Sequence, residues 1–245
     1  FEIADQRQRE HNPLMVAVDW LMRLPQQRCT LAEVRDLLDV PAVRRRFGLS
    51  EDDLPQLTEW LAGAQVRWGL DAGQRASLGL AACGEQNTWL FGLRRMMLGY
   101  ASGDGLDFAG IEPYGEVAGL EAELAGRMAE LVDRLTHWAL ELAQPTPPAQ
   151  WGVRIRQMLS ELFTAVDEHD RLTLAELDDA LGQWLEAAGD AGFEDDLPLT
   201  AAREAWLLGV DEMALNKRFM AGGVTFCTLM PMRAVPFEVV CLLGM

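Results

Sequence analysis

The 245-residue sequence predicts a mainly α-helical fold: a helical bundle-like insertion with short β-strands at both ends. Three observations support this fold class. Apolar residues recur every three or four positions in most segments, as they do on one face of a helix. Ser, Thr, Asp or Asn precede several of these segments, where they cap helix N-termini. Residues 1–4 and 224–243 instead carry short apolar runs that are typical of strands.

The first half of the chain is predicted to be a cluster of short helices. Asn12 before Pro13 is typical of a helix N-terminus, because the Asn side chain accepts backbone N–H groups and Pro fits the first turn. Thr30 and Glu33 have the spacing of a capping box, in which each side chain accepts the other residue's backbone N–H. Such signals predict helices at residues 13–24, 30–38, 41–47, 50–62 and 88–100.

Longer helices are predicted in the second half. Residues 63–88 and 101–115, which are rich in Gly, are expected to be loops, the second of them mobile. Residues 116–143 carry one apolar stripe at helical spacing and predict a long helix. A capping-box pattern at 173–176 predicts that a helix begins there, and the acidic run 167–170 before it is expected to be a solvated loop. The helices expected after the long one are 150–165, 173–188 and 201–214.

The distribution of charge restricts the chemistry of the chain. It has 21 basic and 38 acidic residues, a net charge of −17, and Lys217 is its single lysine. A P-loop needs a lysine directly after a glycine, whereas Lys217 follows an asparagine, so we expect no ATP hydrolysis. Residues 1–100 have a net charge of −1 and residues 101–245 one of −16, so an anionic partner is expected at the first part. Alternatively, the acidic helices are a solvated surface without a partner.

Cysteine and histidine predict neither a metal nor a redox site. The four cysteines lie far apart without a C-x-x-C pair, and the three histidines lack metal-ligand spacing. We therefore expect no metal, no cofactor, and a reducing, cytoplasmic compartment. No apolar window is long enough for a membrane span, and no signal peptide is recognisable. Because the chain starts at Phe1 and ends in an apolar run, we expect a fragment of a longer polypeptide.

Four stretches resemble one family in the same order along the chain. They are residues 38–43, 67–71, 88–100 and 227–233. The last stretch, Cys-Thr-Leu-Met-Pro-Met-Arg, and the run after it look like motif V of superfamily 1 helicases and the strand that follows it. Together, the stretches resemble the RecC family, the gamma subunits of exodeoxyribonuclease V, over nearly the whole chain.

This resemblance implies a helicase-like fold without helicase activity. Residues 1–12 and 222–245 would be edges of an α/β RecA-like domain of the superfamily 1 type, called 2A, and residues 13–221 a helical 2B-like insertion. The family implies RecB-type and RecD-type partner subunits, and DNA as single strand and fork, in a bacterial helicase-nuclease. The implied role is non-catalytic: complex assembly and guidance of DNA strands during double-strand-break repair.

Motif V also implies DNA contacts near the end of the chain. Thr228, Met230 and Arg233 lie where active helicases touch single-stranded DNA, and a hydroxyl and a guanidinium suit phosphate contact. The active motif reads roughly Thr-x-His-x-x-Lys-Gly-Leu-Glu-Phe. Here Met230 stands in place of the His and Pro236 in place of the Glu, so a carboxylate for the nucleotide sugar is missing.

Further candidate DNA contacts are basic or aromatic, and each has a structural alternative. Arg67 and Trp68 offer a charge beside a stacking plane, as single-strand sites do, but a Trp in a loop more often anchors that loop in the core. The other candidates are Arg44, Arg45, Arg46, Arg94 and Arg95. The run of three ends a helix, where Arg also complements the helix dipole. Of the last two, at least one is expected to pair with a local acid.

A second class of function is compatible with the sequence. The net charge of −16 in residues 101–245 also fits an acidic helical protein-interaction module without DNA binding.

Overall fold

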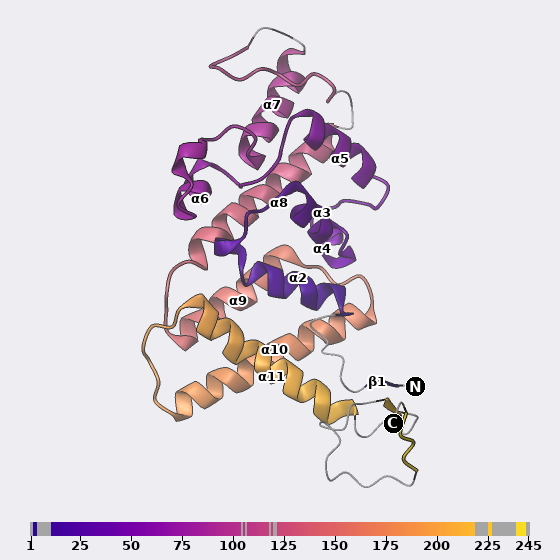
Figure 1. The fold of residues 1–245 in the computed structure, drawn as a ribbon, viewed down its shortest axis with the longest axis vertical. Helices are drawn as coiled ribbons and strands as arrows, with labels where there is room; N and C mark the ends of the chain where they lie inside the picture. The colour runs from indigo at the N-terminus through magenta and orange to yellow at the C-terminus, as the bar shows by residue number, and fades with distance from the viewer. Residues whose placement is uncertain are drawn as a thin grey trace.

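The computed structural model describes residues 2–3, 11–103, 105, 107–117, 119, 122–218, 225–226 and 239–243, with the backbone alone for 2–3, 212–218 and 225–226. Helices dominate this part of the chain, as predicted, and they stack into an elongated body (Figure 1). The first half holds α2 (Pro13–Leu21), η1 (Leu24–Gln26), α3 (Leu31–Leu38), α4 (Pro41–Arg46), α5 (Leu54–Gly63), α6 (Ala72–Ser77), η2 (Ala81–Cys83) and α7 (Trp89–Ser102). The second half holds α8 (Ala122–Glu141), α9 (Pro148–Leu162), α10 (Glu168–Asp190) and α11 (Leu199–Arg218).

Two predicted helix starts are confirmed in atomic detail. Asn12 Oδ1 accepts the backbone N–H groups of Leu14 at 2.9 Å and Met15 at 3.3 Å, which caps α2. At α3, Thr30 Oγ1 accepts the Glu33 N–H at 3.2 Å while Glu33 Oε2 accepts the Thr30 N–H at 2.6 Å. Both motifs satisfy N–H groups that have no partner inside their helix, so they fix where each helix begins.

The predicted start of α10 at residues 173–176 is wrong, and so is the solvated loop at 167–170. Asp167 caps the helix by accepting the Asp170 N–H at 2.9 Å, and α10 runs from Glu168. Thr173 is therefore buried inside the helix, where its Oγ1 accepts a hydrogen bond from Asn12 Nδ2 at 2.9 Å. The Thr had the right spacing for a cap, but an earlier Asp provides the cap instead, and Asn12 satisfies the hydroxyl.

The two predicted loops contain more structure than expected. Residues 63–88 include α6, η2 and a network of backbone hydrogen bonds, so they are not a plain loop. In the second loop, Phe108 and Ile111 exchange both of their backbone hydrogen bonds at 3.0 Å, which closes a tight hairpin turn. The following helix begins at Ala122 rather than at 116.

Four buried tryptophans join segments that are distant in sequence. The Nε1–H group of Trp89 donates to the Cys29 carbonyl at 2.7 Å, and that of Trp138 donates to Glu161 at 3.0 Å. Trp151 donates to Leu197 O at 3.0 Å and Trp206 to Leu177 O at 2.9 Å. Each indole buries a large apolar area and also satisfies its single donor, so these residues fix the packing of their elements.

The long helix α8 is the spine of this arrangement. It packs against η1 and α7, which precede it in the sequence, and against α9, which follows it (Figure 1). The apolar stripe predicted for it is buried from Met128 onward, as helical spacing requires, and Leu124 is half-buried. Its buried members include Met128, Leu131, Leu135, Trp138 and, just beyond the helix, Leu142.

The chain ends meet in a short parallel pair of strands. β1 (Glu2–Ile3) pairs with β2 (Thr225–Phe226), in the register Glu2 to Thr225 and Ile3 to Phe226. The RecA-like domain to which these ends were assigned stays a prediction.

The prediction of a second strand near the end of the chain is wrong for residues 239–243, which are exposed and have no regular secondary structure. A strand needs a hydrogen-bonded neighbour, and the described residues place none beside this run.

The cysteines differ sharply in their surroundings, which gives a direct test of the fold. Cys29 is buried, and this burial, with a smaller effect of the Glu33 charge, raises the pKa of its thiol to about 12, although a hydrogen bond from Gln74 opposes the change. Since the thiolate is the reactive form, Cys29 should resist alkylation at pH 8 while the exposed Cys83 reacts. Peptide mass spectrometry after iodoacetamide treatment, before and after denaturation, measures both. Labelling of native Cys29 as fast as Cys83 would contradict this packing.

Candidate nucleic-acid interface

Backbone hydrogen bonds bring three segments together around Trp68: the residues before α3, those before α6 and the start of α7. The Leu31 N–H donates to Arg67 O at 3.0 Å, and the Gly69 N–H donates to Arg28 O at 2.8 Å. On the other side, the Trp89 N–H donates to Gly69 O at 2.9 Å. The residues near 28, 68 and 88 therefore form one connected layer, although the sequence separates them widely.

A buried arginine organises this layer. Arg75 is only 2% exposed, and its Nη1 donates to the carbonyls of Gly84 at 2.9 Å and Gln86 at 2.8 Å and, more weakly, to that of Cys83. Its Nη2 donates to Trp68 O at 2.7 Å. Burial lowers the pKa of this guanidinium from its ordinary value, yet no carboxylate pairs with it among the described residues. Four carbonyl dipoles thus stabilise the charge in place of an acid.

Trp68 lies between this buried charge and the surface. The Arg75 Cζ atom is 4.1 Å from the centroid of its ring, and the Cζ atom of the exposed Arg28 is 5.9 Å from it. Both distances are in the range of cation–π contacts. Arg67, the adjacent residue, is exposed and donates from Nη1 to Val66 O at 3.0 Å. We call Arg28, Arg67, Trp68 and Arg75 the Trp68 cluster.

The Trp68 cluster is basic because no acid neutralises it. Among the side chains that the structure describes, five arginines form no ion pair with a carboxylate, and three of them belong to this cluster. The other two are Arg35 and Arg45, which are exposed. The cluster therefore combines exposed positive charge with a half-buried aromatic ring, the chemistry of a single-strand contact. The sequence indicated Arg67 and Trp68 but gave no sign of Arg28 or Arg75.

Of the three consecutive arginines at the end of α4, two have structural roles. Arg44 Nη1 donates to the carbonyls of Leu38 at 2.9 Å and Asp39 at 2.8 Å, so it caps the C-terminus of α3. Arg46 approaches Glu130 at 4.0 Å. Arg45 is exposed and unpaired within the described chain, so it is the member of this run with a free charge.

The arginines on α7 both meet acids, which confirms and exceeds the expectation that at least one would. Arg94 Nη1 lies 3.2 Å from Glu85 Oε2 on the surface. Arg95 is mostly covered, and its Nη2 lies 3.5 Å from Glu112 Oε2. It also donates from Nε to the Glu112 carbonyl at 2.9 Å and from Nη1 to Ala64 O at 3.1 Å. Arg95 therefore joins α7 to the segments on both sides of it, and a DNA contact would require breaking these bonds.

The three motif V candidates, Thr228, Met230 and Arg233, lie outside the described residues. Their assignment as strand contacts stays a prediction.

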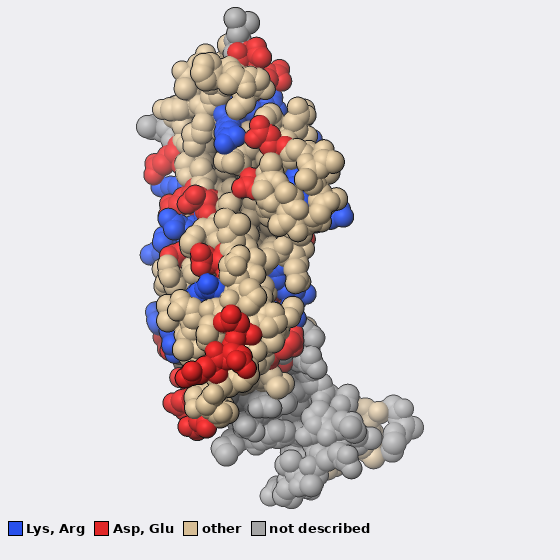
Figure 2. All heavy atoms as spheres, turned by 90° about the vertical axis from the view of Figure 1, so that its left-hand side faces the viewer, with Lys and Arg blue, Asp and Glu red and all other residues tan. Residues whose placement is uncertain are grey.

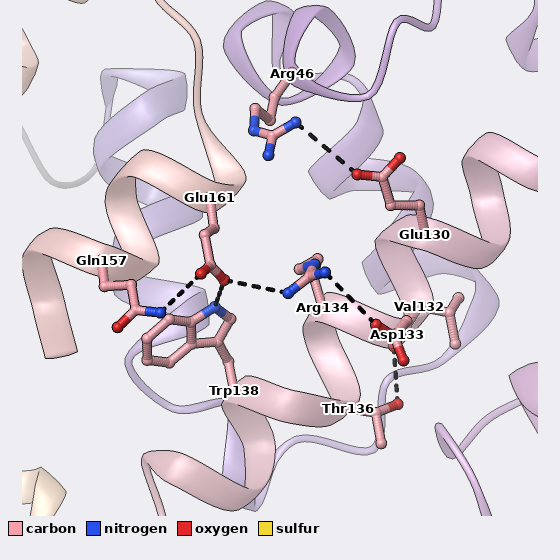
Figure 3. A network of polar contacts seen from close by, with 9 residues as sticks. All are labelled: Arg46, Glu130, Val132, Asp133, Arg134, Thr136, Trp138, Gln157 and Glu161. Carbon is pink, nitrogen blue, oxygen red and sulfur yellow. Dashed lines mark hydrogen bonds and ion pairs between the residues drawn. The ribbon is translucent and has the colours of Figure 1, made fainter.

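A network of polar side chains that the sequence did not indicate joins α4, α8 and α9 (Figure 3). Glu161 is its centre: Oε2 accepts from Trp138 Nε1 at 3.0 Å and lies 3.8 Å from Arg134, while Oε1 accepts from Gln157 at 2.9 Å. Arg134 also lies 4.0 Å from Asp133. The network holds two arginines and three acids, so it links the three helices but is a poor anion site.

Acidic side chains gather at the opposite end of the molecule from α7. The connection from α10 to α11 carries exposed acids, and Figure 2 shows red side chains gathered toward this end. No group of His, Cys, Asp and Glu that could hold a metal occurs among the described residues. Within the same residues, no helix is both long enough and apolar enough to span a bilayer.

Comparison with known proteins places the chain in a family. A family model for the RecBCD enzyme subunit RecC fourth domain matches residues 11–214. RecBCD enzyme subunit RecC of Escherichia coli (strain K12) is 39% identical over 251 residues, which cover 100% of this chain and 22% of that protein. The subunit RecC of Mycobacterium tuberculosis (strain ATCC 25618 / H37Rv) is 33% identical over 258 residues, covering 99% of this chain and 22% of that protein.

The chain thus spans about a fifth of the length of the curated relatives it matches. The match to the family model extends from the cap of α2 to α11 and includes the Trp68 cluster. The chain belongs to the RecC family, and most of it corresponds to the fourth domain of the RecBCD enzyme subunit RecC.

Proposed function

We propose that this chain is a non-catalytic part of a RecC-type subunit of a RecBCD helicase-nuclease. In this role it would take part in assembly with RecB-type and RecD-type subunits and guide DNA strands during double-strand-break repair. It would need no cofactor of its own, since its sequence lacks a P-loop. Residues 13–221 would be the helical insertion, and 1–12 and 222–245 the edges of a RecA-like domain.

The Trp68 cluster is the observation that supports strand guidance. DNA affinity comes mainly from arginines and lysines on phosphates, and base–aromatic stacking adds binding that tolerates any sequence. Arg28 and Arg67 are exposed and free of carboxylates in the described chain, and Trp68 lies beside both. Neighbouring arginines that meet acids, such as Arg94, would have to give up an ion pair to bind a phosphate.

Replacing Arg28 and Arg67 together by Ala should weaken single-strand binding by the full subunit. Losing two phosphate contacts should make the negative slope of log K against log salt shallower by about 1.4, because each contact on a single strand contributes about −0.7. Fluorescence anisotropy with a labelled oligonucleotide between ~50 and ~200 mM salt measures this slope. Fold stability should be nearly unchanged, because neither side chain is buried.

Arg171→Ala is the matched control, because Arg171 is an exposed arginine of α10 that pairs with Glu168. It should leave the salt slope unchanged. Equal slopes for the wild-type subunit and the double variant would reject the Trp68 cluster as a strand contact. The acidic protein-interaction module without DNA binding, the alternative function, has no observation in its favour beyond the net charge.

A further inference from the structure

We propose that the hairpin turn after α7 is a docking element that inserts Phe108 into an apolar pocket with a basic rim on a partner subunit. This inference rests on the assembly role proposed above and names the surface and the partner chemistry for it. It concerns the end of the molecule opposite the acidic α10–α11 connection (Figure 1).

Phe108 is unusually exposed for its size. Its side chain is 71% exposed, and Tyr100 near the end of α7 is 55% exposed. Met97 lies one helical turn before Tyr100 on the same helix and is also exposed. A single apolar side chain on a surface is ordinary, but two aromatics and a methionine at one end resemble the anchors that fill pockets at protein interfaces.

The turn holds Phe108 in a defined geometry. Phe108 and Ile111 exchange two backbone hydrogen bonds of 3.0 Å, and the two residues between them have positive φ, +51° at Ala109 and +77° at Gly110. This combination is that of the tight hairpin turns in which both central residues are left-handed. Ala109 is a non-glycine residue in that region, so the turn is kept at a conformational cost that its surroundings must offset.

The turn is also braced from α7. Arg95 donates from Nε to the Glu112 carbonyl at 2.9 Å, and the Tyr114 N–H donates to the Arg95 carbonyl at 2.9 Å. Gly99 allows α7 to approach the backbone at Tyr114, because a Cβ atom there would overlap the Tyr114 carbonyl. A braced anchor loses little conformational entropy on binding, which favours a docking role over a passive loop.

Charge selects the kind of partner. Residues 98–117 contain four acids and no basic residue, and Asp107 and Glu112 are exposed on either side of the turn. An acidic tip repels DNA, anionic lipid and a second copy of itself. The complementary surface is therefore a protein pocket that is apolar inside and basic at its rim.

The experiment uses the full subunit and its purified partner subunits at physiological salt. Phe108→Ser should weaken their association by about tenfold or more, as truncation of an interface anchor does. Phe193→Ser, at the exposed Phe of the α10–α11 connection, is the control and should change it less than about twofold. Ala109→Gly should keep wild-type association, whereas Ala109→Val, which disfavours positive φ, should weaken it.

A photoreactive phenylalanine analogue at position 108 then identifies the neighbour. Cross-linking to another subunit supports the proposal, and cross-linking within the subunit's own chain, or none at all, overturns it. Unchanged association for Phe108→Ser also overturns it, as does a lower melting temperature of that isolated variant, because Phe108 would then be packed inside its own subunit. If the wild-type subunit does not associate, the assembly role itself fails, which separates the two failures.

Discussion

Replacing Arg75 by Met should lower the free energy of unfolding by about 3 kcal/mol, because its part-buried hydrogen bonds to four backbone carbonyls would be lost together. The side chain is 2% exposed and donates to the carbonyls of Trp68, Cys83, Gly84 and Gln86. Met has a similar length and no donor, so the variant removes the hydrogen bonds while keeping much of the volume. Urea unfolding of the chain, followed by circular dichroism, measures the change.

Two further variants test whether the loss of stability comes from the guanidinium of Arg75 itself. Arg75→Lys should recover less than half of the loss, since one ammonium group cannot span carbonyls that a planar guanidinium reaches together. Arg67→Met, at the exposed neighbour, should stay within about 0.5 kcal/mol of the wild type. Tryptophan fluorescence should also change in Arg75→Met, because Arg75 lies 4.1 Å from the Trp68 ring. A fully stable Arg75→Met variant would mean that water replaces the guanidinium.

The sequence predicted the elements whose signals are local. A cap needs only residues within one helical turn, so Asn12 and the pair Thr30 and Glu33 were recognisable from spacing alone. The same signal failed at Thr173, because Asp167, earlier in the sequence, is the residue that caps the helix. Thr173 instead binds Asn12, which is 161 positions away, and local patterns carry no information about such a contact.

In the candidate interface too, only the residues that are neighbours in sequence could be predicted. Arg67 and Trp68 are neighbours in sequence, so a charge beside a ring could be predicted. Arg28 and Arg75 join them only because the backbone layer near residues 28, 68 and 88 forms. Arg75 lies in a Gly-rich stretch that predicts a loop, where an arginine is normally exposed. Its burial depends on carbonyls from η2 and the turn after it. The spacing of apolar residues in the sequence does not predict where these carbonyls lie.

The close approach at Gly99 predicts the second large effect. Gly99→Ala should destabilise the chain by about 1–3 kcal/mol, because its Cβ atom would overlap the Tyr114 carbonyl and one of the two backbones must move. Helix propensity alone would make the Ala variant more stable by about 1 kcal/mol. A loss of stability would therefore show that α7 approaches the Tyr114 backbone this closely. Thermal unfolding of the variant and the wild type measures it.

Gly126→Ala on α8 is the matched control, since nothing lies within 4 Å of the added Cβ atom. It should raise stability by up to about 1 kcal/mol, as expected for a helix position that has room. Moving α7 away from Tyr114 would also stretch the 2.9 Å bond from Arg95 to Glu112, which braces the turn that carries Phe108. Gly99→Ala should therefore weaken association with the partner subunits as Ala109→Val does, whereas Gly126→Ala should not. A stable Gly99→Ala variant with normal association would show that α7 does not hold the hairpin.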